Sequence, residues 1–515
     1  MLVTSPRPAA RLTARTLVRS LAGGLVAVLA LAGCVAPKEQ STPGAQDGWS
    51  IEAFYAQGVV WEECGDAECA TVRAPLDWDD PEEGGIDLAL KRHRATGPAD
   101  ERIGSLLINP GGPGASGVEF LDYAVASTLS DRLLAAYDVV GFDPRGVGSS
   151  SAVECGDDAE VDEFFAEYRP IESQADLDAA RAVVREFGET CAEDTGPLIG
   201  EIDTASAARD MDLIRALLGD EQLYYAGFSY GTLLGAVYAD LFPDRVGRLL
   251  LDGALDPSNG SDEFVAGQAE GFEDALRSYV EYCLAGQGCP LTGDVEDGLD
   301  QVSALVDRIG ERPLRAGDGR ELNRRMAFYG LAAALYDDES WSYLTLALEE
   351  ALTRDSGQTL YQLANLYLRR DADGTYTSNM MVAFNAINCL DYATVERGFD
   401  EFSAFADELE KVAPTFGTSF AEVTCESWPV EPVGERDTVD APGAAPILVV
   451  GTTGDPATPY EWSVALAEQL ESGTLLTWEG EGHTAYGRGD ACVTETVDAY
   501  LVDGVVPEDG AVCGR

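Results

Sequence analysis

The chain has 515 residues, of which 91 are Asp or Glu and only 34 are Lys or Arg, so its formal charge is −57 at pH 7. This charge excludes nucleic acid and anionic lipid as direct partners and predicts a solvated acidic coat, with steering of cationic peptides as the alternative. Only two histidines and no Cys-x-x-Cys pair occur, so the sequence predicts neither a metal site nor a bound cofactor.

The amino-terminal segment predicts export. Residues 1–33 combine four arginines with an apolar run over 21–32, which is too short for a confident membrane span. The run closes with Leu-Ala-Gly before Cys34, which resembles a bacterial lipobox. Acylation of Cys34 would anchor the protein to the outer face of the cell membrane and would be its only membrane contact, whereas a plain secretory signal is the alternative. Residues 34–48, rich in Pro, Gly, Ser and Gln, predict a flexible tether.

The cysteine content agrees with export. Eleven cysteines minus Cys34 leave ten, an even number that suits an oxidising compartment. One sequence does not determine their connectivity. Proximity along the chain suggests five disulfides, namely Cys64–Cys69, Cys155–Cys191, Cys283–Cys289, Cys389–Cys425 and Cys492–Cys513.

A glycine-rich turn follows an early apolar strand. The strand covers 105–108, and residues 109–114 read Asn-Pro-Gly-Gly-Pro-Gly. Such a turn can direct a backbone N–H group at a developing oxyanion. Gly112 is the first choice for this donor and Gly111 the second.

The same turn has a second interpretation. With Asp143 after the next strand, it satisfies the dinucleotide pattern G-x-G-x-x-G through Gly112, Gly114 and Gly117. The export signal disfavours this interpretation, because nicotinamide cofactors are scarce outside the cytoplasm.

The motif Gly-Phe-Ser-Tyr-Gly at 227–231 predicts a catalytic serine. An apolar, aromatic stretch of strand character precedes it, and residues 232–239 have helical spacing. A serine on the sharp turn between them would be held in strained backbone with its hydroxyl exposed. The backbone N–H of Tyr230 would then be an oxyanion donor. A chance match is possible among 55 glycines, but the strand-turn-helix setting favours Ser229 as the nucleophile.

Helical spacing dominates the middle of the chain. Apolar residues recur three or four positions apart in five segments, at 264–284, 295–309, 324–336, 341–352 and 360–368. Together with the motif around Ser229, these segments predict an α/β-hydrolase fold with a mostly parallel sheet flanked by helices. Its core consists of residues 49–257 and 441–515, and residues 258–440 form an inserted helical lid. Such lids exclude water and select substrates.

Two late loops complete a candidate catalytic triad. A strand over 446–451 leads to Asp455, and a strand over 474–478 leads to His483. The chain order Ser, Asp, His is that of an α/β-hydrolase triad. His483 would act as the base, and Asp455 would hold its tautomer. The other histidine, His93, lies among basic residues in an early strand and is expected to be a plain surface residue.

These motifs together resemble a known family. The segments at 109–114, 143–150 and 227–231 resemble the proline iminopeptidase branch of the α/β-hydrolases. Nearly the whole chain after the signal, including 386–391 and 425–429, is more closely similar to the secreted tripeptidyl aminopeptidases of actinobacteria. That resemblance implies an exopeptidase that removes short peptides from free amino termini without a metal or cofactor. Asn-Pro at 109–110 replaces the His-Gly of iminopeptidases, which favours the tripeptidyl branch.

An exopeptidase needs a carboxylate to bind the substrate ammonium. Asp391 is the predicted partner because it lies two residues after Cys389 in a family-like segment; helix capping or solvent exposure is the alternative. Thr458 is predicted to support Asp455 by a hydrogen bond. Two other functions stay open: a secreted carboxylesterase with the same triad, and a non-catalytic peptide-binding lipoprotein, which the intact triad disfavours.

Overall fold

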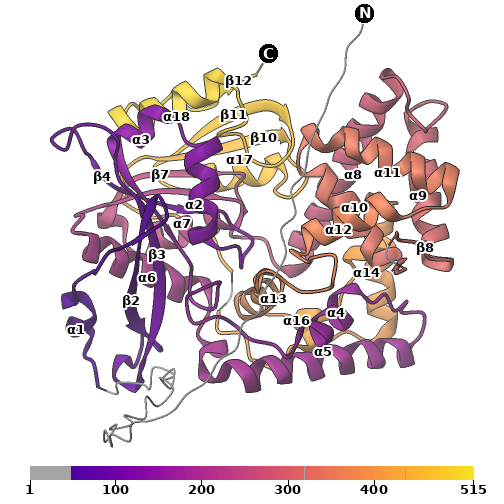
Figure 1. Cartoon of the computed structure of the whole chain (residues 1–515), viewed down its shortest axis with the longest axis horizontal. Coiled ribbons are helices and arrows are strands. Elements are labelled where there is room, and N and C mark those ends of the chain that lie inside the picture. The colour runs from indigo at the N-terminus through magenta and orange to yellow at the C-terminus, as the bar shows by residue number, and fades with distance from the viewer. Residues whose placement is uncertain (1–47, 318, 435, 515) are drawn as a thin grey trace, which may run out of the picture. The chain divides into compact units, whose positions relative to one another are not determined.

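The computed structural model describes residues 48–514 except 318 and 435. The predicted signal peptide, Cys34 and all but the last residue of the tether lie outside the described residues. A ten-stranded sheet forms the centre of the described part (Figure 1). In spatial order its strands are β1 (Glu62–Cys64), β2 (Ala67–Pro75), β3 (Gly85–His93), β5 (Tyr137–Phe142), β4 (Gly104–Asn109), β6 (Leu223–Phe228), β7 (Val246–Asp252), β10 (Ile447–Gly454), β11 (Gly473–Glu481) and β12 (Ala511–Cys513).

The strand directions agree with the predicted fold. β1, β2, β3 and β5 pair antiparallel, whereas every pair from β5 to β12 is parallel. The carboxyl ends of the parallel strands therefore meet at one edge of the sheet. Alternate side chains of these strands enter two separate cores, as Leu106 and Leu107 of β4 do. Both faces are thus buried, as expected for a mostly parallel sheet.

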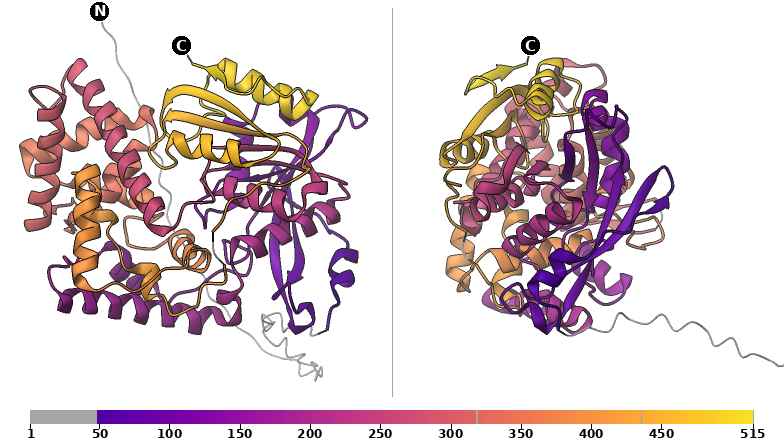
Figure 2. Two further views of the ribbon diagram at one scale, coloured as in Figure 1. Left: turned by 180° about the vertical axis from the view of Figure 1, so that it is seen from behind. Right: turned by 90° about the vertical axis from the view of Figure 1, so that its left-hand side faces the viewer.

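Helices cover both faces of the sheet. One core contains side chains from α1 (Ile51–Ala56), α6 (Thr204–Leu218), α7 (Tyr230–Leu241) and α17 (Tyr460–Gln469). The other contains side chains from α2 (Gly117–Tyr123), α3 (Asp131–Ala136) and α18 (Ala491–Asp503). The arrangement confirms the predicted α/β-hydrolase fold, and Figure 2 shows the layers from two further directions.

The predicted lid segment is helical. Its five predicted helices are present as α8 (Ser261–Ala285), α9 (Val295–Glu311), α10 (Arg324–Leu335), α11 (Trp341–Arg354) and α12 (Gln358–Tyr367). Four further helices were not predicted: α13 (Met380–Asp391), α14 (Phe399–Val412), α15 (Gly417–Phe420) and α16 (Thr424–Ser427). Within the described part of this segment, the only strands are β8 (Leu314–Arg315) and β9 (Glu321–Leu322).

A second helical insertion joins the lid. Helices α4 (Asp158–Ala166) and α5 (Gln174–Thr195) follow β5 and fall within the range predicted as core. However, α5 contacts α16 (Figure 1), and Arg181 of α5 donates to Glu426 of α16 at 2.6 Å. Helix α5 therefore packs against the segment predicted as the lid, although helical periodicity alone did not indicate which element it would cover.

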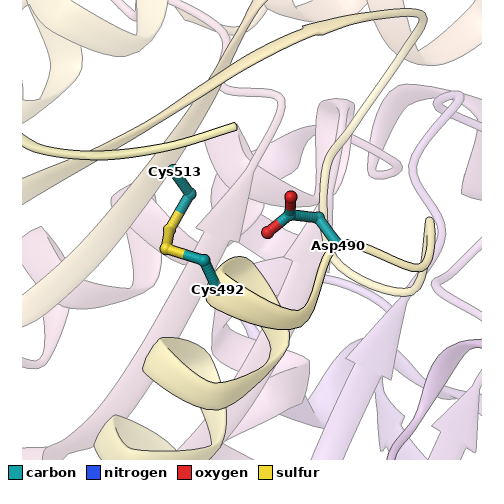
Figure 3. A group of neighbouring side chains, drawn as sticks. All are labelled: Asp490, Cys492 and Cys513. Carbon is teal, nitrogen blue, oxygen red and sulfur yellow. A yellow bond between two sulfur atoms is a disulfide. The ribbon is translucent and has the colours of Figure 1, made fainter. Parts of the chain in front are cut away.

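All five suggested disulfides are present in the structure. Figure 3 shows the last of them, Cys492–Cys513, beside Asp490. These three residues are the only cluster of potential metal ligands in the described part of the chain, and both of its sulfur atoms belong to the disulfide. The Asp490 carboxylate instead caps α18 by accepting the Val493 N–H. Among the described helices, none is long and apolar enough to cross a membrane.

Candidate active site

Ser229 lies on the turn between β6 and α7, as predicted. Its backbone has φ 56° and ψ −126°, a region that residues other than glycine rarely adopt. The turn is tight, since a Cβ atom on Gly227 would lie 2.3 Å from the carbonyl oxygen of Gly231. The Ser229 N–H donates to the carbonyl oxygen of Asp252 at the end of β7. The strand-turn-helix motif therefore holds Ser229 in strained backbone at the carboxyl edge of the sheet.

Asp455 and His483 are in direct contact. Asp455 follows β10 and is 4% exposed. Nδ1 of His483 lies 2.9 Å from each carboxylate oxygen. The carboxylate also accepts the N–H groups of Ala457, Thr458 and Thr484 and the Thr458 hydroxyl, at 2.9–3.1 Å. Nδ1 thus faces the acid, and Nε2 is left on the opposite side of the ring. Thr458 makes the predicted bond to Asp455.

The end of β7 connects Ser229 with His483. Asp252 accepts the Ser229 N–H at 3.0 Å, and Gly253 follows it. A Cβ atom on Gly253 would lie 3.3 Å from Cε1 of His483 and 3.2 Å from the hydroxyl oxygen of Thr458. The edge of the His483 imidazole therefore packs on Gly253, and the neighbouring residue, Asp252, accepts the Ser229 N–H. Asp455 and His483 are thus in contact, and the backbone of Asp252 and Gly253 joins them to the Ser229 turn.

The glycine-rich turn lies over Ser229. A Cβ atom on Gly111 would be 2.8 Å from Cβ of Ser229 and 3.0 Å from the nitrogen of Tyr230. Tyr230 begins α7, so its N–H has no acceptor within the helix. The Gly111 N–H already donates to Oδ1 of Asn109 at 2.9 Å, which argues against Gly111 as an oxyanion donor. Gly112, the first choice, and Tyr230 remain the candidate donors.

Asp143 has a structural role in this region. It is fully buried and accepts the Ser116 hydroxyl at 2.6 Å, the Val118 N–H at 3.0 Å and the Ser149 N–H at 2.8 Å. These bonds attach the helix after the glycine-rich turn to the 143–150 segment. The carboxylate is therefore used internally, which gives the dinucleotide interpretation no support.

Asp391 is linked through Thr204 to the side chain of Tyr230. It ends α13 and accepts both the N–H and the hydroxyl of Thr204, at 2.9 and 2.5 Å. The Thr204 hydroxyl lies 2.6 Å from the phenolic oxygen of Tyr230. Burial raises the pKa of Asp391, and Arg436, 4.0 Å away, opposes that shift. Asp391 thus accepts the first N–H of α6, and its assignment to the substrate ammonium stays a prediction.

The lid contacts the loop of the base directly. The carbonyl oxygen of Tyr336, just after α10, accepts the His483 N–H at 2.8 Å. The two rings meet edge to face with centroids 5.4 Å apart, and burial raises the pKa of Tyr336 to about 12. Arg488, five residues after His483, donates to Asp337 at 2.9 Å and to Asp338 at 2.7 Å. The position of the lid is therefore coupled to that of the imidazole.

A row of rings runs from the imidazole to a lid cavity. Tyr336 lies 6.1 Å from Tyr367, which stacks on Tyr329 at 5.3 Å. Tyr329 lines a cavity of about 280 Å³ between the second insertion and the lid. Arg325 and Glu422, 3.4 Å apart, also line this cavity. Sequence patterns did not predict it, because its walls come from segments far apart in the chain.

Sequence reasoning also missed individual residues near the site. Asp252 had a usable signal, because it is an acid at the end of a buried strand. Asp455 has a similar position, directly after the end of β10. Thr204 and Tyr336 had none, because only tertiary contacts bring them to the site. His93 ends β3, with β5 and β4 between it and β6, so it lies outside the site; it is half-buried, however, and not the plain surface residue that was expected.

Known proteins extend this description. Residues 413–513 match the family described as TAP-like protein. Serine protease Hip1 from Mycobacterium tuberculosis is 40% identical over 489 residues, which cover 90% of this chain and 92% of that protein. The chain belongs to the tripeptidyl aminopeptidase-like family of α/β-hydrolases.

Other members of the family have different names. Carboxylesterase B from M. tuberculosis is 38% identical over 96% of both chains. A tripeptidyl aminopeptidase from Streptomyces lividans is 32% identical, again over 96% of both chains. The resemblance stated from the motifs is therefore confirmed, and the chain is a hydrolase of this serine peptidase family.

Proposed function

We propose that the protein is an exported serine exopeptidase that releases short peptides, foremost tripeptides, from free amino termini. The observation that carries the proposal is the contact of Nδ1 of His483 with both carboxylate oxygens of Asp455, beside the strained Ser229. This geometry supports an acyl-transfer mechanism in which the three residues act as a triad.

The reaction would begin with attack of the Ser229 hydroxyl on the scissile carbonyl carbon while Nε2 of His483 accepts its proton. Asp455 would stabilise the imidazolium through Nδ1. The oxyanion would accept hydrogen bonds from the N–H groups of Tyr230 and Gly112. Collapse would transfer the proton to the leaving amine and leave an acyl-enzyme. Water, deprotonated by His483, would then release the peptide.

The amino-terminal restriction is supported by the lid and by the names of relatives. The lid touches the base loop through Tyr336, so it borders the reacting bond on one side. Two Streptomyces relatives are named tripeptidyl aminopeptidases. A cleft closed at one end by such a lid would measure the peptide from its ammonium group. Asp391 is the acid proposed to meet that group.

The test compares tripeptide anilides with free and acetylated amino termini. Acetylation would remove the positive charge that meets the partner carboxylate and would add bulk at the closed end of the cleft, a loss of roughly 2–5 kcal/mol, or about 30- to several-thousand-fold in kcat/KM. Mass spectrometry of the products from an unblocked peptide library would give the length released. Equal rates on free and blocked substrates would overturn the aminopeptidase proposal and favour an endopeptidase or esterase.

A carboxylesterase is the second candidate, because one relative is named carboxylesterase B. The same triad and oxyanion donors would cleave esters, so only substrate selection separates the two functions. Wild-type kcat/KM on a panel of acyl esters, set against the tripeptide anilides, decides between them. A clear preference for esters that lack an ammonium group would favour the esterase.

We also propose that the enzyme is anchored to the outer face of the membrane by a lipid on Cys34. The support is the lipobox-like sequence and the five disulfides in the part of the chain that the structure describes. A Cys34→Ala variant should lose lipid labelling and membrane retention and keep its hydrolase activity. Membrane retention of this variant equal to that of the wild type would contradict the anchor.

A further inference from the structure

Asp252 is a buried acid that the triad mechanism does not use. It ends β7 and is 0% exposed. Its carbonyl oxygen accepts the Ser229 N–H at 3.0 Å, so its main chain lies directly against the nucleophile turn. This strand end is fixed on both sides, by Phe228 of β6 and Val450 of β10, which are its partners in the sheet.

The carboxylate of Asp252 points to the other side, at the loop of His483. It accepts the Ala485 N–H at 2.9 and 3.1 Å and the Tyr486 N–H at 2.7 Å. The preceding N–H, that of Thr484, donates to Asp455. Three consecutive backbone donors after the imidazole are thus divided between two carboxylates.

This loop needs such support. Thr484 has φ 65°, a left-handed conformation that is strained for a β-branched residue and persists only where surrounding bonds impose it. The strained residue lies between the imidazole and the two N–H groups that Asp252 holds. If these bonds were lost, the loop could relax and rotate His483 away from Asp455 and Ser229.

Burying the Asp252 carboxylate to accept two backbone N–H groups has a desolvation cost. Burial raises the pKa of Asp252 to about 7, and the nearby charge of Asp455 adds to that shift, while backbone N–H groups and His483 oppose it. His483 and Asp455 are the titratable groups that act on its carboxylate. A neutral acceptor would avoid this cost of desolvation, so the charged group has no advantage for stability.

We propose that Asp252 is a positioning residue whose carboxylate clamps the loop after His483 and keeps the imidazole aligned between Asp455 and Ser229. Asp455 orients the ring from Nδ1; Asp252 orients the backbone that carries the ring. The proposal rests on the proposed function only in taking Ser229 as the nucleophile and His483 as its base, and it holds for peptide or ester substrates alike.

The test compares Asp252→Asn with a matched control, Glu273→Gln. Glu273 in α8 is also a buried acid that accepts a backbone N–H, from Thr415 at 2.9 Å, and burial raises its pKa as well. The first readout is the rate at which a fluorophosphonate labels Ser229, because this rate depends on activation of the serine whichever substrate is natural. The second is kcat and KM from pH 5 to pH 9 on the substrate that the wild type hydrolyses.

We expect Asp252→Asn to lower the labelling rate and kcat by roughly 10- to 100-fold with little change in KM, as small misplacements of catalytic groups do. Glu273→Gln should keep the wild-type labelling rate and kcat. In the wild type, protonation of Asp252 should contribute to the fall of kcat at low pH, and this contribution should be absent in Asp252→Asn. Because the raised pKa makes ionised Asp252 unfavourable in the fold, the melting temperature of Asp252→Asn relative to wild type should rise from pH 5 to pH 8.

Unchanged labelling by Asp252→Asn would overturn the proposal. It would also fail if Glu273→Gln lost as much activity, or if the loss followed the melting temperature, since either result indicates a general structural role. If the Asn variant does not fold, Asp252→Ser, which is smaller and can accept one N–H, replaces it under the same criteria. A wild type that labels but cleaves no peptide would instead contradict the proposed function and leave this comparison intact.

Discussion

The carboxyl edge of the sheet and the helical lid differ in how their residues reach the active site. At the sheet edge, Ser229, Asp455 and His483 each follow a buried strand within two residues, so the register of neighbouring strands brings them together. In the lid, Tyr336 and Asp391 reach the site from helices whose packing partners lie far away in the chain. The difference teaches that the residues proposed to carry the chemistry are fixed by the sheet, whereas the lid is free to change which substrates are admitted. Relatives named as a protease, an esterase and an aminopeptidase agree with this division.

The largest effect should come from the sheet edge. Ser229→Ala and His483→Ala should each lower kcat by about 10⁴-fold or more, and the double variant should be no worse than either single one, because the residues act as a unit. Hydrolysis of a free tripeptide anilide measures this, with thermal unfolding as the control for folding. Full activity of a folded His483→Ala protein would remove the triad from the mechanism.

Thr458 tests how far the chemistry extends from the triad. Thr458→Val removes the hydroxyl that donates to Asp455 at 3.0 Å, a hydrogen bond to a charged group worth about 1.5 kcal/mol or more. We expect kcat to fall roughly tenfold with KM little changed, and Thr458→Ser to restore most of the rate. Equal rates for the Val and Ser variants would show that the hydroxyl does not support the acid.

Asp391 tests the boundary between the two regions. Asp391→Asn removes the charge proposed to meet the substrate ammonium, so we expect kcat/KM on the free anilide to fall roughly tenfold while the acetylated anilide changes little. Separate measurement of kcat/KM on both substrates makes the comparison. An equal loss on both substrates would instead show that Asp391 acts only through its hydrogen bonds to Thr204.

Arg488 tests the coupling of the lid and should have the smallest effect. Arg488→Gln breaks its ion pairs with Asp337 and Asp338, which are partly exposed and worth roughly 1 kcal/mol or less. We expect KM to rise about threefold or less at nearly constant kcat. Arg277→Gln, which breaks the exposed pair with Glu296 within the lid, is the matched control and should change neither constant.

Parts of the site were predictable because their signals are local. The Gly-x-Ser-x-Gly motif with its flanking periodicities located Ser229, and two strands followed by an acid and a histidine located Asp455 and His483. Near neighbours among the cysteines gave all five disulfides, since short separations keep the two thiols within reach. The same signal, an acid at the end of a buried strand, also marks Asp252.

The sequence by itself determined the α/β-hydrolase fold and located the serine turn, the acid and the histidine of the proposed triad, because strand and helix periodicities and tight turns depend on residues close together in the chain. Only the tertiary structure decided that α4 and α5 join the lid, that Asp391 binds Thr204, and that Asp252 and Tyr336 hold the loop of His483. These contacts join residues up to 245 positions apart. They depend on which faces become buried together, and no local pattern encodes that choice.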